Sequence, residues 1–506
     1  MAIVGGQAHA RPGVSGHYAD GTPLLSWETS ENAMILSAFL CLAAIPQAYR
    51  VADLDRDASA LGGVAWRVHD SGQVAGSALA IGAPDWQGVI YSAAGTQFLP
   101  NLPGDEVGSA YDVNAAGTAV GESDDVVPIG HQLRIYPHAV VWIQGQVTPL
   151  TSLISGGDPI EPLNAYAIND RGQILGYGRY AAGSFLRTFL LENGIVTDLD
   201  DLHPGPDGGS SPGAMNERGQ VVGTSDGPLF FRHAFLWENG VMEDLHDPAI
   251  LLGRVSSAWD INDRGQIVGG GDYGADFLDY EVATLWDNGA ILNLGLLAGN
   301  ESWARGINDH GLIVGGALNG SFENVAVMWQ DGALVDLNTR IPAGSGWHLL
   351  IANDVDNSGR IIGEGSYLGA LRPFVLIPEC DGAFQVYGAG CAGGGGYTPY
   401  LTGSGCPEPG GIVSLALTLG AAGQSGLLLA GIGTGVHSIA PGCDLQILPL
   451  LDRRAPLGLD SAGSALLRLR LPAGLAPGIY NLQAALRDPG ASSGATVSNP
   501  LRVDVR

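Results

Sequence analysis

The sequence predicts an all-β protein that consists of a seven-bladed β-propeller, closed by an N-terminal strand, and a C-terminal antiparallel β-sandwich. Three observations predict this fold class. One unit occurs seven times with a period of 45 to 55 residues, each unit reads as four short strands, and the seventh unit lacks a strand that stands unmatched before the first. A β-solenoid of seven repeats is the alternative architecture, because it also stacks short strands at a fixed period.

The seven units align on a glycine that ends each second strand. Two clear copies are residues 164–176, with the sequence NAYAINDRGQILG, and residues 257–269, with the sequence SAWDINDRGQIVG. The aligned glycines are Gly76, Gly121, Gly176, Gly223, Gly269, Gly315 and Gly363. Self-similarity at this period is typical of propellers and solenoids, in which each unit buries its apolar face against the next.

Each unit predicts four strands, which we call a, b, c and d. Strand a alternates apolar and polar residues and ends in an Asn-Asp-x-Gly turn, and strand b has the pattern Gln-Ile-Val-Gly. Strand c is apolar, as in residues 233–237 (HAFLW), and an Asn-Gly turn leads to strand d, which ends near Asp-Leu. Asn, Asp and Gly provide the positive φ angles of tight hairpins. We therefore expect Asn169-Asp170, with its equivalents at 262–263 and 308–309, to form turns rather than to bind ligands.

The two ends of the repeat region predict a closed ring. The seventh unit contains a strand c at residues 372–377, but Pro378 and Cys380 follow in place of a strand d. Residues 49–54 end like a strand d and have no other strands of their own. Pairing this N-terminal strand with the seventh unit leaves neither edge with unpaired backbone groups.

An uncharged apolar run, Ile35–Ile45, directly follows Met34. It is too short to span a bilayer, which takes about 20 residues, and it suits the apolar core of a signal peptide. The sequence therefore predicts a leader at 1–33 upstream of the true start and a signal peptide at 34–48. The mature protein is then secreted or at the cell surface, with no membrane span. A buried apolar strand or helix is the alternative interpretation of the run.

The C-terminal part, residues 380–506, differs in composition from the propeller predicted at residues 49–379. Gly- and Pro-rich turns separate alternating strands, which we expect at residues 412–419, 427–432, 445–451, 465–471, 479–486 and 500–505. The part also holds every cysteine of the mature chain, namely Cys380, Cys391, Cys406 and Cys443. An even number suits disulfides in an oxidising compartment, and four cysteines allow three pairings. Zinc is the less favoured alternative, because no C-x-x-C pattern occurs.

Both parts show a resemblance to proteins known from outside the cell. The His-Ala-Phe at 233–235, partly repeated at 138–139, 282–283 and 325–326, makes residues of about 49–378 similar to the extracellular HAF-repeat family. That resemblance implies an extracellular repeat protein and carries no catalytic residues. The C-terminal part resembles modules on secreted proteins of planctomycete-like bacteria, through residues 387–391, 442–445, 478–483 and 498–501. This second resemblance implies a role in surface attachment or sorting.

Charge excludes one class of partner. The chain has 23 basic residues against 51 acidic ones, which gives a formal net charge of -28, and its sequence contains no cluster of basic residues. Phosphate groups are bound by clustered cations, so neither a nucleic acid nor an anionic membrane is expected as a partner. No H-E-x-x-H, G-x-S-x-G or P-loop pattern occurs either, so no catalytic set can be assembled from motifs.

The loops predict where binding occurs. Strand direction alternates within a unit, so the a–b and c–d turns lie on one face and the b–c and d–a loops on the other. Only the second set varies in length, and variable loops on a rigid scaffold commonly carry binding residues. The aromatic candidates in these loops are Trp86, Tyr136, Tyr180, Phe230, Tyr273, Tyr280 and Tyr367. Their alternative role is to cover the core of the blades.

An acidic loop suggests calcium as a possible cofactor. Its candidate ligands are Asp272, Asp276, Asp279 and Glu281, which lack the order of an EF-hand and can equally be solvated acids. The function that the sequence favours is a non-catalytic binding protein, secreted or at the cell surface, that binds a glycan or a surface protein. The alternatives are an extracellular polysaccharide hydrolase or lyase, with Asp272 or Asp276 at the channel, and a structural envelope protein.

Overall fold

The computed structural model describes residues 48–506, except for residues 56–59, 130–131, 157–159, 181–184, 204–207, 228–229, 275–280, 331, 381, 441 and 492–493. The predicted leader, and the predicted signal peptide apart from Ala48, lie outside the described residues. No helix among the residues that the structure describes has the length and apolar character needed to cross a membrane.

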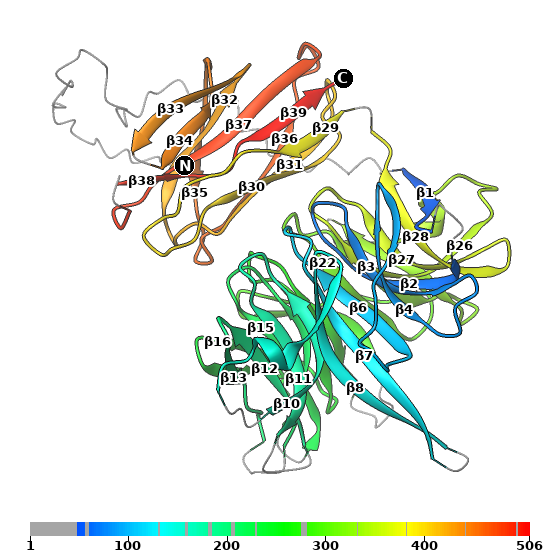
Figure 1. The fold of residues 1–506 in the computed structure, drawn as a ribbon. Helices are drawn as coiled ribbons and strands as arrows, with labels where there is room; N and C mark the ends of the chain where they lie inside the picture. Colours follow the sequence, from blue (N-terminus) through cyan, green and yellow to red (C-terminus); the bar gives the residue numbers. More distant parts are fainter. Residues whose placement is uncertain are drawn as a thin grey trace. The chain divides into compact units, whose positions relative to one another are not determined.

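Strands β1–β28 form seven four-stranded antiparallel sheets, one for each repeat (Figure 1). Within each sheet, strand a is at one edge and strand d at the other. The first blade consists of β2 (Ala60–Val68), β3 (Val74–Ala80), β4 (Gln87–Ser92) and β5 (Gly95–Phe98), and the second of β6 (Val107–Val113), β7 (Ala119–Ile129), β8 (Gln132–Ile143) and β9 (Gln146–Pro149). The third consists of β10 (Ile160–Ile168), β11 (Ile174–Tyr180), β12 (Leu186–Glu192) and β13 (Ile195–Asp198). The fourth consists of β14 (Ser210–Met215), β15 (Val221–Asp226), β16 (Arg232–Glu238) and β17 (Val241–Asp244).

Blades five to seven continue the same pattern. They consist of β18 (Ser256–Ile261), β19 (Ile267–Asp272), β20 (Glu281–Asp287) and β21 (Ala290–Asn293); β22 (Ser302–Ile307), β23 (Ile313–Leu318), β24 (Asn324–Gln330) and β25 (Ala333–Asp336); and β26 (Trp347–Val355), β27 (Ile361–Tyr367) and β28 (Ala370–Pro378) with β1 (Tyr49–Asp53). Two short 3-10 helices, η1 (Leu150–Leu153) and η3 (Leu337–Arg340), follow strand d in the second and sixth blades.

The seven sheets close into a ring, which confirms the predicted propeller and contradicts the β-solenoid. Strand β2 of the first blade packs against β26, β27 and β28 of the seventh. Strand β1 supplies the missing strand d, with Tyr49 opposite Pro378 and Asp53 opposite Phe374 in the antiparallel register. Seven apolar clusters follow the ring, each shared by two neighbouring blades. Burial of apolar side chains between blades therefore holds the ring together.

The repeat glycine is explained by a bulge in strand a. In every blade the pairing of strands a and b shifts by one residue in the middle of strand a. The shift brings the backbone of the two strands so close that a Cβ on Gly315 would collide with the carbonyl oxygen of Trp303. The other six aligned glycines each face the corresponding carbonyl in the same way. Only glycine fits this close approach.

The turns use the residues that the sequence predicts. In the third, fourth and fifth blades the c–d turns have positive φ at both central residues, as at Asn193 (51°) and Gly194 (80°). This is the geometry of a type I′ hairpin. The a–b turns likewise place their glycine at positive φ, for example Gly265 at 78°. The Asn-Asp pairs are therefore turn formers, as predicted, but they also have a second role that is described below.

The C-terminal part folds as an antiparallel β-sandwich. One sheet has the order β29-β39-β37-β32-β35 with β38 paired to β37, a second has the order β30-β31-β36, and β33 pairs with β34. The strands are β29 (Ala383–Val386), β30 (Tyr400–Gly405), β31 (Ile412–Thr418), β32 (Ser425–Gly431), β33 (Thr434–Ala440), β34 (Cys443–Ile447), β35 (Leu450–Gly458), β36 (Ala465–Arg470), β37 (Gly478–Arg487), β38 (Ala495–Val497) and β39 (Leu501–Val505). Leucines from the two larger sheets, such as Leu415 and Leu486, share one buried cluster.

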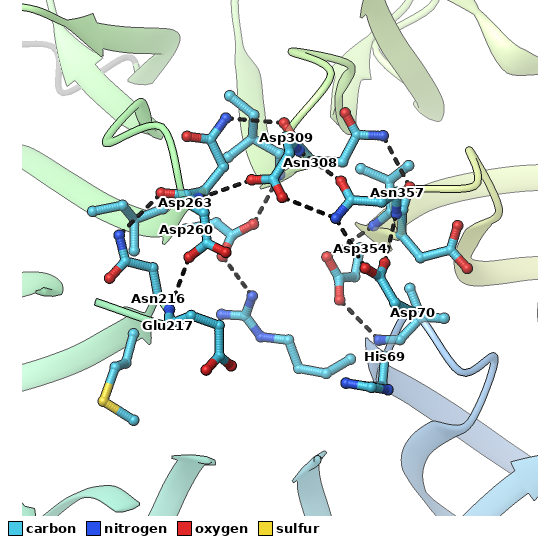
Figure 2. A pocket seen from close by; sticks show the side chains of 18 of the residues that line it. His69, Asp70, Asn216, Glu217, Asp260, Asp263, Asn308, Asp309, Asp354 and Asn357 are labelled. Atoms are coloured by element: carbon cyan, nitrogen blue, oxygen red, sulfur yellow. Dashed lines mark hydrogen bonds and ion pairs between the residues drawn. The ribbon is translucent and has the colours of Figure 1, made fainter. Parts of the chain in front are cut away.

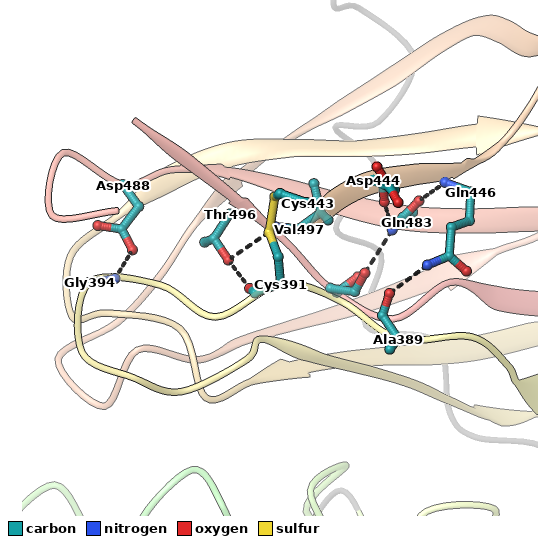
Figure 3. Close-up of a disulfide and its surroundings, with 11 residues drawn as sticks. Ala389, Cys391, Gly394, Cys443, Asp444, Gln446, Gln483, Asp488, Thr496 and Val497 are labelled. Atoms are coloured by element: carbon teal, nitrogen blue, oxygen red, sulfur yellow. Dashed lines mark hydrogen bonds between the residues drawn. A yellow bond between two sulfur atoms is a disulfide. The ribbon is translucent and has the colours of Figure 1, made fainter. Parts of the chain in front are cut away.

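The four cysteines adopt one of the three pairings that the sequence left open, with the disulfides Cys380–Cys406 and Cys391–Cys443. The second bond is buried in an apolar cluster with Leu429 and Val497. Figure 3 shows it beside Thr496 and Val497, and the backbone N–H of Val497 donates to the Sγ of Cys391 at 3.3 Å. The bond thereby joins two segments 52 residues apart in sequence.

Candidate binding sites

An ion pair crosses the axis of the ring. Arg67 extends from strand β2 of the first blade, and its Nη1 lies 2.7 Å from Oδ1 of Asp260 in the fifth blade. Its Nη2 also donates to the carbonyl of Gly213 at 3.0 Å in the fourth blade. Burial alone would lower the pKa of Arg67, but the carboxylates of Asp260, Asp354 and Asp112 raise it. Arg67 is therefore a permanent cation that connects opposite sides of the ring.

Carboxylates on strand a connect neighbouring blades at three of the junctions. The Oδ2 of Asp354 accepts the N–H of Val68 at 2.8 Å, across the junction of the seventh and first blades. Asp112 accepts the N–H of Ile168 in the third blade in the same way, at 2.9 Å. Asp260 likewise accepts the N–H of Ile307 in the sixth blade, at 2.8 Å. Burial raises the pKa of Asp112 to about 6, although the Arg67 guanidinium opposes this rise.

The Asn residues of the a–b turns form a ring of hydrogen bonds. The side chain of Asn262 accepts from Gln266 N–H at 3.0 Å, which closes its own turn. Its Nδ2 also donates to the carbonyl of Asn308 at 2.9 Å, in the turn of the next blade. The same inter-blade bond runs through Asn114, Asn169, Asn216 and Asn308. The repeated Asn thus shapes the turn and also connects neighbouring blades.

The residues that follow these Asn form a second ring. The backbone N–H of one turn donates to the side chain of the next, as from Glu217 to Asp263 and from Asp263 to Asp309, both at 2.9 Å. Where the second blade has Ala115 instead of an acid, the Nε2 of His69 from the first blade reaches Asp170 at 3.4 Å. The acidic and amide members of this ring are Asp70, Asp170, Glu217, Asp263, Asp309 and Asn357.

These rings surround a pocket of about 290 Å³ on the axis at the turn end (Figure 2). Arg67, Asp260 and Asp354 line it together with the turn residues. Burial, with repulsion from Asp170, raises the pKa of Glu217 to about 7. Burial and neighbouring carboxylates also raise the pKa of Asp263 and of Asp309. These carboxyl groups already accept backbone N–H groups of neighbouring blades, so the residues that line the pocket primarily hold the blades together.

A tier of aromatic side chains lies next to the Arg67–Asp260 ion pair. Its members directly precede, in strand a of each blade, the residue equivalent to Arg67. In each blade the residue skipped by the strand a bulge stands at this level: Trp66, Tyr111, Tyr166, Gly213, Trp259, Arg305 and Asn353. The four aromatic side chains and Asn353 are partly exposed and Arg305 is exposed. Bulges commonly re-aim side chains next to functional sites. We call these seven positions the aromatic tier.

The face that carries the b–c and d–a loops, which we call the long-loop face, displays most of the exposed apolar side chains of the propeller. Those on this face are Leu61, Ile81, Trp86, Leu133, Ile135, Tyr136, Phe185, Leu186, Phe230, Ile250, Leu252, Leu296, Phe322, Tyr367, Leu368 and Leu371. At the opposite end, large exposed apolar side chains among the described residues are limited to Ile143, Ile195, Val241, Leu292 and Leu153, which lies beside Gly194 of a c–d turn. Exposed apolar groups concentrated in this way mark an interaction surface.

Backbone conformation distinguishes the same loops. Phe230, Phe322 and Leu368 in the b–c loops have positive φ angles of 62°, 60° and 50°. This conformation costs a bulky L-residue about 1–2 kcal/mol, and the c–d turns of the same protein avoid the cost with Asn and Gly. Phe322 and Leu368 are nevertheless 68% and 78% exposed. Leu368 and Gly369 form a two-residue hairpin with positive φ at both positions, and the N–H of Phe322 closes its turn on the carbonyl of Asn319 at 2.9 Å. Turn geometry therefore explains the φ angles but not the bulky apolar side chains, and bulky residues at such positions are typical of sites that serve binding.

The predicted aromatic residues belong to six of the seven repeats. Trp86 and Tyr136 are 39% and 43% exposed, and Tyr367 is 38% exposed with its ring 5.1 Å from Trp347. Phe230 stacks on His203 at 4.1 Å. Tyr273 instead packs on the apolar cluster between the fourth and fifth blades and bonds Thr284 at 3.1 Å. Tyr280 and the side chain of Tyr180 lie outside the described residues. No ring contact joins the described members to one another.

Two of the predicted calcium ligands can be located. Asp272 is buried and accepts from Gly274 N–H at 2.9 Å, and Glu281 is half-buried with an Oε1 3.5 Å from Ser257. Asp276 and Asp279 lie outside the described residues. Within the described part of the chain, no three His, Cys, Asp or Glu side chains are arranged to hold a metal ion.

Sequence reasoning missed Arg67 and the aromatic tier. The available signal was the position directly after the repeat alanine, which is Trp, Tyr, Tyr and Trp in four units and Arg in one. That position varies, so alignment on constant residues conceals it. Only the closed ring shows that these side chains come from different blades to one level of the axis.

Comparisons with known proteins support no assignment beyond the fold. No family model and no curated protein matches the chain. Among solved structures, TolB from Acinetobacter baumannii is similar with 10% identity over 63% of each chain and a TM-score of 0.31. Trypanosoma rangeli sialidase is similar with 12% identity over 97% of this chain and 94% of its own, and a TM-score of 0.31. PorZ, a surface component of the type-IX secretion system of Porphyromonas gingivalis, has 12% identity over 85% and 64%, and a TM-score of 0.31. Similarities this weak carry no conclusion about activity or partners.

Proposed function

We propose that the chain is a non-catalytic binding protein that acts outside the cell and holds a protein partner on the long-loop face of its propeller. The observation that carries the proposal is the one-sided distribution of exposed apolar side chains, several of them at positive φ. Stability alone disfavours such residues, so their presence on one face supports a role in contact with a partner.

The composition of the face favours a protein over a glycan. Many of its exposed side chains are aliphatic, including Leu133 at 70% and Ile135 at 62% exposure. Aliphatic groups offer no flat surface for a sugar ring, whereas they fill pockets in protein interfaces together with aromatic anchors. The net charge of -28 disfavours a strongly acidic partner, so the partner is neutral or basic.

The second blade illustrates the proposed docking. Strands β7 and β8 continue beyond their neighbours, and their outer halves pair only with each other. Ile135 lies opposite Val126, and Leu133 opposite Pro128, so these four share one side of the ribbon. That side is apolar and exposed at Leu133 and Ile135. A projecting ribbon with one apolar side suits insertion into a groove of a protein partner.

Separate observations support an extracellular location. Two disulfides in the sandwich suit an oxidising compartment. The resemblance of the repeats to the extracellular HAF-repeat family and the apolar run at 35–45 support the same location. The mature N-terminus, measured by intact mass on protein from its native host, is expected near residue 48, and a mature terminus near Met1 would contradict secretion.

Site-specific photo-crosslinking tests the proposed function. A photoreactive amino acid is placed at Leu133 or Leu368 on the long-loop face, or at Ile195 or Val241, which are 65% and 67% exposed at the opposite end. In the native host, the first two positions are expected to capture one defined protein and the last two are not. The purified partner should then bind the intact chain and bind at least tenfold more weakly to Leu133→Ser. Equal capture at both ends, or none at all four positions, would overturn the proposal.

A further inference from the structure

We infer that the aromatic tier is a carbohydrate-binding site that accepts the end of a neutral glycan. The inference goes beyond the proposed protein docking and concerns different residues, which lie on the innermost strands rather than in the loops. It begins from a regularity: the bulge in strand a occurs at the same position in all seven blades. Seven bulges therefore present seven side-chain positions at one level of the axis.

Aromatic rings occupy consecutive positions of the tier. The ring centroids of Trp66 and Tyr111 are 5.9 Å apart, and those of Tyr111 and Tyr166 are 5.6 Å apart with an interplanar angle of 23°. Opposite this row, the Arg305 guanidinium lies 5.2 Å from the centre of the Trp259 ring. Gly213 contributes no side chain to the tier, because the backbone of Ala258 in the next blade approaches it too closely for a Cβ. Partly exposed aromatic surface therefore faces the axis from several directions.

Hydrogen-bonding groups accompany the rings. The hydroxyl of Tyr111 donates to Oε1 of Glu122 at 2.5 Å, and Nδ2 of Asn164 donates to Oε2 of the same carboxylate at 2.7 Å. The Oδ1 of Asn164 is buried and has no partner among the described residues. In the seventh blade, Asn353 donates to Oε1 of Glu364 at 3.4 Å. The tier thus combines flat apolar surface with acceptors at its edges.

A sugar ring has the matching chemistry. Its C–H groups form an apolar face that packs on an aromatic ring, and its hydroxyl groups donate to carboxylates and amides at the periphery. Glu122 and Glu364 already accept from Tyr111, Asn164 and Asn353, but a carboxylate has further lone pairs that sugar hydroxyl groups can use. Glu122, Glu281 and Glu364 outnumber Arg305, the one cation among the seven tier positions, so a polyanionic ligand would be repelled.

The floor of the tier determines which part of a glycan can enter. Arg67 and Asp260 follow directly after Trp66 and Trp259 in their strands, and their ion pair crosses the axis at 2.7 Å. A chain cannot pass this bridge without breaking it. Access is therefore from the end where strand a begins, on the long-loop face, and the ligand is a chain end rather than the middle of a polymer.

Titration of the full chain with defined oligosaccharides tests the inference. The probes are neutral cello-, xylo-, manno- and malto-oligosaccharides, with oligogalacturonate as the acidic comparison, and binding is measured by calorimetry. We expect at least one neutral series to bind, and Trp66→Ala and Trp259→Ala to weaken that binding at least tenfold. The control is Ile195→Ala, which removes an exposed apolar side chain at the opposite end of the propeller and should leave the affinity unchanged.

A second variant guards against misfolding of the tryptophan variants. Glu122→Gln preserves the shape of the side chain and one acceptor, and it is expected to weaken binding at least threefold without lowering the melting temperature. The inference is overturned if no neutral series binds, if oligogalacturonate binds more tightly than every neutral series, or if Ile195→Ala weakens binding as much as Trp259→Ala. These outcomes leave the photo-crosslinking result of the proposed protein docking unaffected, so the two failures are distinguishable.

Discussion

The guanidinium of Arg67 and the carboxylate of Asp260 meet at 2.7 Å although 193 residues separate them in sequence. The pair connects the first blade to the fifth and separates two chemically different ends of the axis. At the turn end, carboxylates and amides accept backbone N–H groups and fasten the blades together. At the other end, the aromatic tier and the long-loop face present partly exposed apolar surface.

Replacement of Arg67 by methionine should destabilise the propeller strongly at pH 8. The change leaves Asp112, Asp260 and Asp354 buried without their shared cation, and removal of one partner from a buried ion pair costs about 3–5 kcal/mol. The free energy of unfolding, measured by guanidinium chloride titration, should fall by about this amount. The control is Arg179→Met, which breaks an exposed pair with Glu161 and should cost less than about 1 kcal/mol. An equal loss in both variants would show that the axial pair has no special role.

Stability should increase as the pH falls from 8 to about 5.5. Burial raises the pKa of Glu217 to about 7 and of Asp112 and Asp356 to about 6, above the values near 4 of an unfolded chain. A raised carboxyl pKa means that the folded state binds the proton more tightly, so stability is lost as the pH rises through the folded pKa. The melting temperature should therefore be higher at pH 5.5 than at pH 8.

The variant Glu217→Gln isolates one contributor to this pH dependence. Its amide oxygen can still accept the N–H of Asp170, which donates to Oε1 of Glu217 at 2.8 Å, but the side chain no longer titrates. We expect a higher melting temperature than wild type at pH 8 and a flatter profile between pH 5.5 and 8. A profile that falls toward acid, or one as steep as in wild type, would contradict this assignment.

The repeat glycines should not tolerate even a methyl group. A Cβ on Gly315 would collide with the carbonyl of Trp303, and forced overpacking of this kind costs about 1–3 kcal/mol. Gly62 lies in strand a of the first blade, has no atom within 4 Å of an added Cβ and serves as the control. Thermal unfolding of Gly315→Ala and Gly62→Ala compares the two sites. The bulge explanation fails if Gly315→Ala unfolds at the same temperature as Gly62→Ala.

The fold was accessible from the sequence because its signals are local and repeated. The aligned glycines, the Asn-Gly turns and the alternating strands all reflect backbone requirements within one blade, so seven copies strengthen each of them. The unmatched strand at 49–54 also has a local pattern, that of a strand d. The seventh unit lacks a strand d, so pairing the two was the one arrangement that left no unpaired edge, and β1 does pair with β28. The strands β29, β30, β33 and β38 escaped prediction because they are short or contain glycine. The single strand expected at 445–451 was wrong: it is two strands, β34 and β35, and β35 was missed because its sequence contains Asp452, Arg453 and Arg454 instead of an apolar run.

The sites were less accessible because they depend on which blades face each other. Residues at the Arg67 position are Arg, Asp, Ala, Ala, Asp, Gly and Asp in the seven units, and no local pattern pairs the first with the fifth. The second role of the turn Asn escaped notice for the same reason, since its Nδ2 reaches a carbonyl about 46 residues ahead, as from Asn262 to Asn308. The disulfide pairing likewise required the arrangement of the sandwich strands.

The central claim is that strand β1 closes seven sheets into one ring, and amide hydrogen exchange tests it most directly. Two chains are compared, one that begins at Ala48 and one that begins at Asp55, so that only the second lacks β1. Since Val51 lies opposite Leu376 in the closed sheet, loss of β1 should expose the edge of β28 and speed exchange across Phe374–Ile377 at least tenfold. The melting temperature should fall as well. Unchanged exchange in β28 and an unchanged melting temperature would contradict the closure, and with it the assignment of chemistry to the two ends of the axis.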